Sequence, residues 1–169
     1  MIFFKKNKGF TLVETIVAIA ILLLGIFSAL TLMASSLSFS QSSEQMIVVV
    51  NLAREGVEMV RVVRDMEGFD SAKLDEGDKI ITIDTNDGDL EVNSAGTSQI
   101  EDCVVCDLYF KNDRYVHDVS GALTIFKRLI IIENMDNSPV TEKKIVSTIY
   151  WTERGRSHTF KLETYIKDW

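Results

Sequence analysis

The sequence predicts an α+β fold, in which one long N-terminal helix packs on a C-terminal antiparallel β-sheet. Three observations support this prediction: residues 15–34 form an apolar run without charge, residues 46–66 repeat apolar side chains at helical spacing, and the last third of the chain alternates apolar and polar residues. Twenty helical residues span about 30 Å, the thickness of a membrane's hydrocarbon layer. We therefore expect the first half of the helix to span a membrane and the second half to be amphipathic.

Composition excludes some functions for this chain. The chain has 169 residues and a net charge of −7, and its first nine residues already contain three lysines, so the remainder is more acidic still. A protein that binds nucleic acid electrostatically needs a basic surface, so no direct nucleic-acid binding is expected. Two cysteines are too few for a disulfide framework.

Three classes of segment compete for the N-terminus. A cleaved secretory signal has an apolar core of about 7–15 residues, which is shorter than the uncharged run here. A plain transmembrane anchor fits the length, and Lys5, Lys6 and Lys8 would keep the N-terminus in the cytoplasm. Neither class explains Glu14, the only acidic residue before Phe39, which lies at the edge of the apolar run.

A helix cap is one local explanation for Glu14. Residues 11–14 read Thr-Leu-Val-Glu, the S/T-x-x-E pattern of a capping box. In that motif Thr11 would be the N-cap, and the Glu14 carboxylate would accept a hydrogen bond from the Thr11 backbone N–H. This alternative stays open at the level of sequence.

The stretch KGFTLVE, followed by an apolar helix, resembles the GFTLVE-type N-terminal methylation signature of type IV prepilins and pseudopilins. The resemblance covers Lys5 to about Leu37. It implies that a membrane prepilin peptidase cuts between Gly9 and Phe10 and then N-methylates Phe10. It also implies that Glu14 is an assembly residue, whose carboxylate pairs with the N-terminal ammonium of a neighbouring subunit.

The same resemblance implies a domain plan and a function. Residues 1–9 would be a cleaved basic leader, residues 10–37 a transmembrane and filament-core helix, and residues 38–169 an extracytoplasmic pilin-like α+β head. The chain would be a structural subunit of a type IV pilus or related pseudopilus, used in adhesion, motility, secretion or DNA uptake. The lack of a proline within the apolar helix, where many type IV pilins have one, favours a minor subunit.

The implied partners follow from this life cycle. They are other copies of the chain or other pilin subunits, the prepilin peptidase, an inner-membrane assembly platform and the cell membrane. The chain would be a single-pass membrane protein with a cytoplasmic N-terminus before assembly, and part of a surface filament afterwards. The alternative is a membrane-anchored extracytoplasmic binding module that does not polymerise.

Two patterns describe the second half of the predicted helix. Apolar residues spaced by four and three predict the face that packs on the sheet: Met46, Val50, Ala53, Val57 and Val60. A charged stripe predicts the ion pairs Arg54–Glu58 and Arg61–Asp65 at i,i+4 spacing on the solvated face.

Residues 67–102 lose the helical period and are rich in Asp, Gly, Ser and Asn. They predict strands at 79–84 and 90–92 within a variable insert rather than a second domain. The DTNDGD stretch at 84–89 lies between them and departs from the EF-hand pattern by one residue, so an Asp-Gly hairpin turn is favoured over a calcium site.

The C-terminal third predicts a hairpin and three long strands. Residues 107–110 and 114–119 flank a turn at Lys111-Asn112-Asp113. Strands are then expected at 122–135, 143–153 and 157–169, the last two joined at Arg154-Gly155-Arg156.

The sequence offers little chemistry beyond these elements. Cys103 and Cys106 form a lone C-x-x-C without a thioredoxin-like context, so a local disulfide is expected, with two free thiols as the alternative. A zinc site would also need His117 and His158, whose spacing matches no zinc finger. No catalytic constellation is evident, so no enzyme activity, cofactor or metal is expected.

Overall fold

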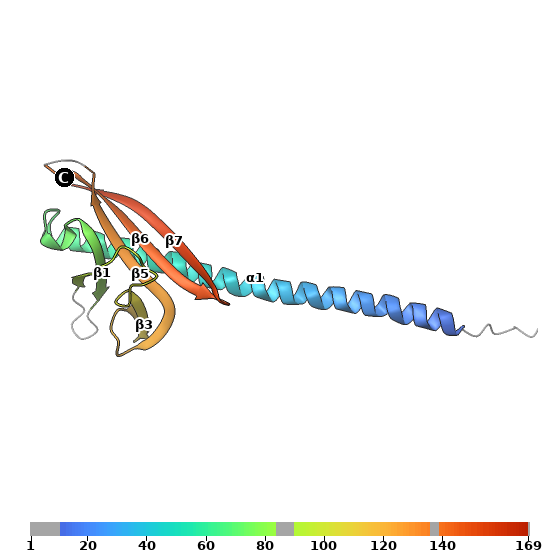
Figure 1. The fold of residues 1–169 in the computed structure, drawn as a ribbon. Helices are drawn as coiled ribbons and strands as arrows, with labels where there is room; N and C mark the ends of the chain where they lie inside the picture. The colour runs from blue at the N-terminus through green and yellow to red at the C-terminus, as the bar shows by residue number, and fades with distance from the viewer. Residues whose placement is uncertain (1–10, 84–89, 136–138, 169) are drawn as a thin grey trace, which may run out of the picture. The chain divides into compact units, whose positions relative to one another are not determined.

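The computed structural model describes residues 11–83, 90–135 and 139–168 (Figure 1). The chain forms two compact units, Met1–Gln45 and Met46–Trp169, and each is described separately. Helix α1, Leu12–Glu67, begins in the first unit and ends in the second. In the first unit its side chains are almost all exposed, whereas in the second unit one face is buried.

The second unit is an antiparallel sheet covered by the C-terminal part of α1, which confirms the predicted α+β fold. Seven strands of the described residues form this sheet: β1 Gly77–Ile83, β2 Leu90–Ser94, β3 Asp107–Lys111, β4 Arg114–Val116, β5 Ala122–Asn134, β6 Glu142–Glu153 and β7 Arg156–Lys167. Figure 1 shows β5, β6 and β7 as long neighbouring strands.

Strand β5 is the centre of the sheet. One of its edges pairs with β6 from Phe126 to Asn134, and β6 pairs in turn with β7. The other edge is shared, because β3 pairs with the beginning of β5 and β1 with residues 130–132 near its end. Strands β2 and β4 pair with β1 and β3, respectively.

Two tight turns confirm the predicted hairpins. Asn112 and Asp113 both have positive φ, and so do Arg154 and Gly155. Positive φ at both central residues is the geometry of a two-residue turn whose twist matches that of the flanking strands. Each turn is one residue shorter than predicted, because Lys111 of β3 pairs with Arg114 and Glu153 of β6 pairs with Arg156.

The buried face of α1 agrees only in part with the predicted one, since Ala53, Val57 and Val60 are buried as expected. Met46 is 41% exposed and Val50 is only partly buried, so these two assignments were wrong. The buried face consists of Val49, Leu52, Ala53, Gly56, Val57, Met59, Val60 and Val63. Gly56 explains this choice of face, because a Cβ atom there would lie 2.6 Å from Ser147 Oγ on β6. The absence of a side chain lets α1 approach the sheet closely at this residue.

The predicted ion pairs on α1 were wrong as well. Arg61 pairs with Glu58 at 2.5 Å instead of with Asp65, and it also reaches Thr164 on β7 at 3.4 Å. Asp65 pairs with its neighbour Arg64 at 2.7 Å. Helical spacing brings several partners within reach, and the nearby strand selects one of them. Pairs this exposed contribute about 0–1 kcal/mol.

The segment predicted to be an insert contributes two strands to the sheet. Strands β1 and β2 do form where the sequence placed them, but β1 pairs with β5 and buries Ile81 completely under α1. A buried lysine anchors the segment that connects α1 to β1. Lys143 Nζ of β6 donates hydrogen bonds to the carbonyl oxygens of Phe69 and Leu74, each at 3.0 Å.

A buried arginine joins three elements of this unit. Arg128 on β5 is 1% exposed, pairs with Glu55 of α1 at 3.3 Å and donates a hydrogen bond to the Ile81 carbonyl oxygen of β1 at 3.2 Å. Burial lowers the pKa of Arg128, and the Glu55 carboxylate opposes that shift. The guanidinium therefore remains a cation that fixes helix and strands together.

His117, which follows β4, is held in its neutral form. Its Nδ1 donates a hydrogen bond to the Asp107 carbonyl oxygen at 3.1 Å, while its Nε2 is buried without a hydrogen-bond partner in the described structure. Burial lowers the pKa of His117 from 6.5 to about 3, and the charge of Arg128 acts in the same direction.

We expect the stability of the second unit to fall between pH 6.5 and about pH 3. In that window the unfolded chain binds a proton at His117 that the folded chain does not. The free energy of unfolding is therefore highest above pH 6.5, and it declines by at most about 1.4 kcal/mol per pH unit below that pH. Urea unfolding at several pH values measures this slope. His117→Gln should remove it and His158→Gln should keep it; an unchanged slope in His117→Gln would contradict the assignment.

We also expect Gly56→Leu to lower the free energy of unfolding by about 1–3 kcal/mol, because the new side chain must displace Ser147 and Arg128. Arg54→Leu is the matched control, since residue 54 is exposed on the same helix. Urea unfolding of the full chain in detergent micelles, followed by tryptophan fluorescence, measures both. Equal effects of the two substitutions would show that the close approach at Gly56 has no energetic consequence.

Candidate functional site

Helix α1 begins with a threonine cap. The Thr11 side-chain oxygen accepts a hydrogen bond from the Glu14 backbone N–H at 3.3 Å, and the Thr11 carbonyl oxygen accepts one from the Thr15 N–H at 3.2 Å. These bonds satisfy N–H groups that the first turn of any helix leaves without a helical partner. One half of the capping box suggested by the sequence is therefore present.

The other half of the capping box is absent. The Glu14 carboxylate is exposed and makes no hydrogen bond or ion pair within residues 11–83, 90–135 and 139–168. In particular it does not accept a bond from the Thr11 backbone N–H. The cap on α1 thus needs the Thr11 side chain and the Glu14 backbone, but not the acidic group of Glu14. The carboxylate is available to a partner from outside.

The surface of α1 after Glu14 is apolar on every side. Residues 15–43 contain no charged side chain, and the large apolar residues among them are mostly more than half exposed. In the part of the chain that the structure describes, α1 is the one helix long and apolar enough to cross a membrane. Such a surface needs lipid or other protein around it.

Several hydroxyl groups on this segment are satisfied within the helix. Ser28, Thr31 and Ser35 each donate to the carbonyl oxygen four residues earlier, at 2.8, 2.9 and 3.0 Å. An unsatisfied hydroxyl would be costly in hydrocarbon, so these bonds suit a membrane or a filament core. The sequence signal for these bonds is a Ser or Thr within an apolar helical run, which the predictions above did not use.

Comparison with known families bears on this same segment. Residues 4–34 match the family model described as the prokaryotic N-terminal methylation motif. The chain carries the N-terminal signal of type IV pilins and pseudopilins. This signal and the long apolar helix together fit a membrane-anchored, pilin-like protein, and they point to a structural protein rather than an enzyme. No curated protein and no solved structure matches the chain.

The residues expected to be processed lie within the matched signal. Gly9 and Phe10 fall inside residues 4–34 but outside the described residues, so their roles remain predictions from sequence. Glu14 falls inside the same match, and its pairing with another subunit is likewise a prediction.

The two cysteines are joined in the head. Cys103 and Cys106 form a disulfide in the loop before β3, and both residues are buried. Among the described residues, no group of three or more His, Cys, Asp or Glu side chains could hold a metal ion. His158 instead stacks on the Trp151 ring. The DTNDGD stretch at 84–89, where calcium was the alternative to a turn, lies outside the described residues.

Proposed function

We propose that the chain is a structural subunit of a type IV pilus or related pseudopilus, and that its function is polymerisation. The observation that carries this proposal is the methylation signal at residues 4–34, which leads into a helix with an apolar surface on every side. Lipid surrounds that apolar surface before assembly, and neighbouring helices surround it afterwards. The lack of a proline within the apolar helix supports a minor rather than a major subunit.

Processing is the first step of the proposed assembly. A prepilin peptidase removes residues 1–9 by cutting between Gly9 and Phe10, and methylates the new amino group of Phe10. Residues 10–37 then form the membrane-spanning and filament-core helix, and residues 38–169 form the extracytoplasmic head. Methylation keeps the amino group positively charged, so Phe10 still offers an ammonium to a partner.

Glu14 supplies the complementary charge. An unpaired charge in hydrocarbon costs several kcal/mol, so a lone carboxylate beside an apolar helix is unfavourable until a cation reaches it. The Phe10 ammonium of a neighbouring subunit is such a cation. The attraction between the two charges offsets the cost of removing each of them from water. The free carboxylate on a helix capped by Thr11 supports this pairing.

Transfer from membrane to filament completes the proposal. An inner-membrane platform moves the subunit out of the bilayer, and burial of the apolar helix against its neighbours stabilises the filament by about 25 cal/mol for each Å² withdrawn from water. The alternative function, an anchored binding module that does not polymerise, would leave the subunit monomeric in the membrane.

We expect the mature protein to lack its first nine residues and to carry one methyl group on Phe10. Intact-mass analysis of chain extracted from membranes of a host with a prepilin peptidase measures both changes. Without reduction, the mass should also lack the two hydrogens lost in the Cys103–Cys106 disulfide. An intact leader, or a mature form that begins near Ser35 as a secretory signal would give, would contradict the pilin proposal.

We expect Glu14→Val and Glu14→Gln to block incorporation into filaments while leaving membrane insertion and leader cleavage intact. Without the carboxylate, the Phe10 ammonium is buried unpaired at a cost of about 3–5 kcal/mol, which lowers incorporation by roughly several hundredfold. Immunoblots of sheared filaments and of the membrane fraction measure assembly and insertion separately.

Thr11→Ala is the matched control for this experiment. It removes the cap on α1 at a cost of about 1 kcal/mol but keeps the carboxylate, so most assembly should remain. If Glu14→Gln assembles like the wild type, or if Thr11→Ala fails as completely as Glu14→Val, then Glu14 contributes to the helix start and not to a charge pair between subunits.

A further inference from the structure

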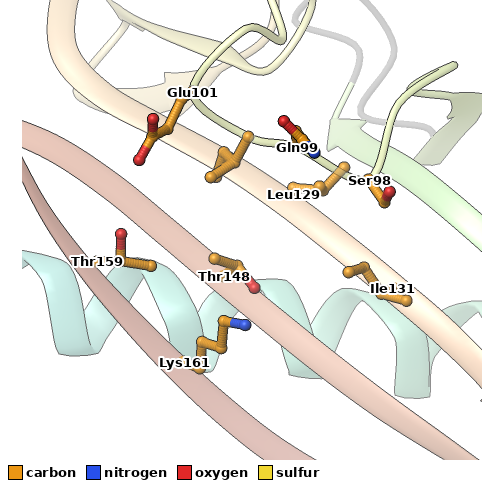
Figure 2. A pocket seen from close by; sticks show the side chains of 9 residues that line it. Ser98, Gln99, Glu101, Leu129, Ile131, Thr148, Thr159 and Lys161 are labelled. Carbon is orange, nitrogen blue, oxygen red and sulfur yellow. The ribbon is translucent and has the colours of Figure 1, made fainter.

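A pocket of about 320 Å³ opens on the face of the sheet opposite α1 (Figure 2). Arg128 and Ser147 lie next to Gly56 on the helix side, and successive side chains of a strand point to opposite faces, so Leu129 and Thr148 lie on the other side. Lys161 on β7 and the loop residues 98–101 complete the lining.

The loop wall of the pocket is fixed in position. Lys127 Nζ on β5 donates hydrogen bonds to the carbonyl oxygens of Glu101 and Cys103, each at 3.0 Å. The Cys103–Cys106 disulfide closes the next turn of the loop, and Ile100 packs against Leu129 in the same small core. A ligand would therefore meet a preformed wall and lose little affinity to ordering it.

Opposite charges line this pocket without neutralising each other. Lys161 comes from β7 and Glu101 from the loop, and Figure 2 shows them on different sides of the pocket. In the part of the chain that the structure describes, neither has an ion-pair partner, and they do not pair with each other. Both side chains are exposed, so water solvates them in the free protein. Lys144 of β6, by contrast, pairs with Glu163 of β7 at 3.4 Å.

A third polar group in the lining lacks a partner. Thr148 is 3% exposed, and its hydroxyl makes no hydrogen bond in the described structure. A buried hydroxyl left without a partner costs about 1–3 kcal/mol, and such groups in folded proteins call for an explanation. The Thr148 oxygen atom is itself buried, so a ligand in the pocket does not reach it and does not relieve this cost.

We propose that the pocket binds a small zwitterion of the amino acid or dipeptide class. The ligand carboxylate pairs with Lys161, its ammonium pairs with Glu101, and its apolar side chain rests on Leu129 and Ile131. A volume of about 320 Å³ lies at the lower end of the range for small-molecule sites, which suits a ligand of this size. All these residues belong to the second unit, Met46–Trp169.

Glycyl-leucine is the probe for this site. Full-length chain with labelled isoleucine methyl groups is titrated in a non-ionic maltoside micelle, which competes for neither charge. The methyl signals of Ile100 and Ile131 at the pocket should shift and saturate, while those of Ile145 and Ile149, in the core beneath α1, should stay in place. Absence of a saturable shift at millimolar dipeptide overturns the proposal.

Capped probes test the two charges of the ligand. N-acetylglycyl-leucine lacks the ammonium and glycyl-leucinamide lacks the carboxylate, so each should bind roughly tenfold more weakly than glycyl-leucine. If both bind as well as the dipeptide, the pocket recognises only an apolar body and the zwitterion proposal is wrong.

Substitutions test the pocket's side of the same contacts. Lys161→Met and Glu101→Gln should each weaken glycyl-leucine binding roughly tenfold, whereas Arg156→Met, an exposed cation on the same strand, should not. Thr148→Val should stabilise the free protein, because it removes the unpartnered hydroxyl, and should leave binding unchanged; Thr152→Val should change neither. Unchanged binding in Lys161→Met and Glu101→Gln would overturn the assignment.

Discussion

The close packing of α1 on β5 and β6 at Gly56 is the constraint on which the rest of the head depends. The missing side chain brings the helix near enough for Glu55 to reach Arg128, and the same guanidinium binds the Ile81 carbonyl oxygen of β1. Three segments distant in sequence thus meet at one buried cation. A buried charge is tolerated only when it is paired and hydrogen-bonded, so helix face and strand register are fixed together.

The two parts of helix α1 differ in the surroundings that their side chains suit. In the first unit it has no charge between Glu14 and Glu44, and its hydroxyls bond to its own carbonyl oxygens. In the second unit small and branched apolar residues cover a sheet, while charged residues face water. The single carboxylate of Glu14 is the exception to the apolar surface, and it makes no ion pair within the described residues.

The second unit has a rigid interior beneath α1 and an open pocket on the opposite face of the sheet. Buried cations fix the helix side, where Lys143 holds the carbonyl oxygens of Phe69 and Leu74. On the other side the disulfide-closed loop lies over the sheet and leaves polar groups of the pocket without partners. The second unit therefore presents a preformed pocket on the face of the sheet opposite α1.

The sequence by itself determined the features that depend on local chemistry: the membrane-length apolar helix, the methylation signal, the strands and the two hairpin turns. Local residues suffice for these, because hydropathy, helical period and turn geometry act within a few residues. Only the tertiary structure decided that Val49 and Gly56 rather than Met46 face the sheet, that β1 enters the core, and that Arg61 pairs with Glu58. Those outcomes depend on which distant segment lies opposite. A run such as Val48-Val49-Val50 fits more than one helix face until a strand selects one.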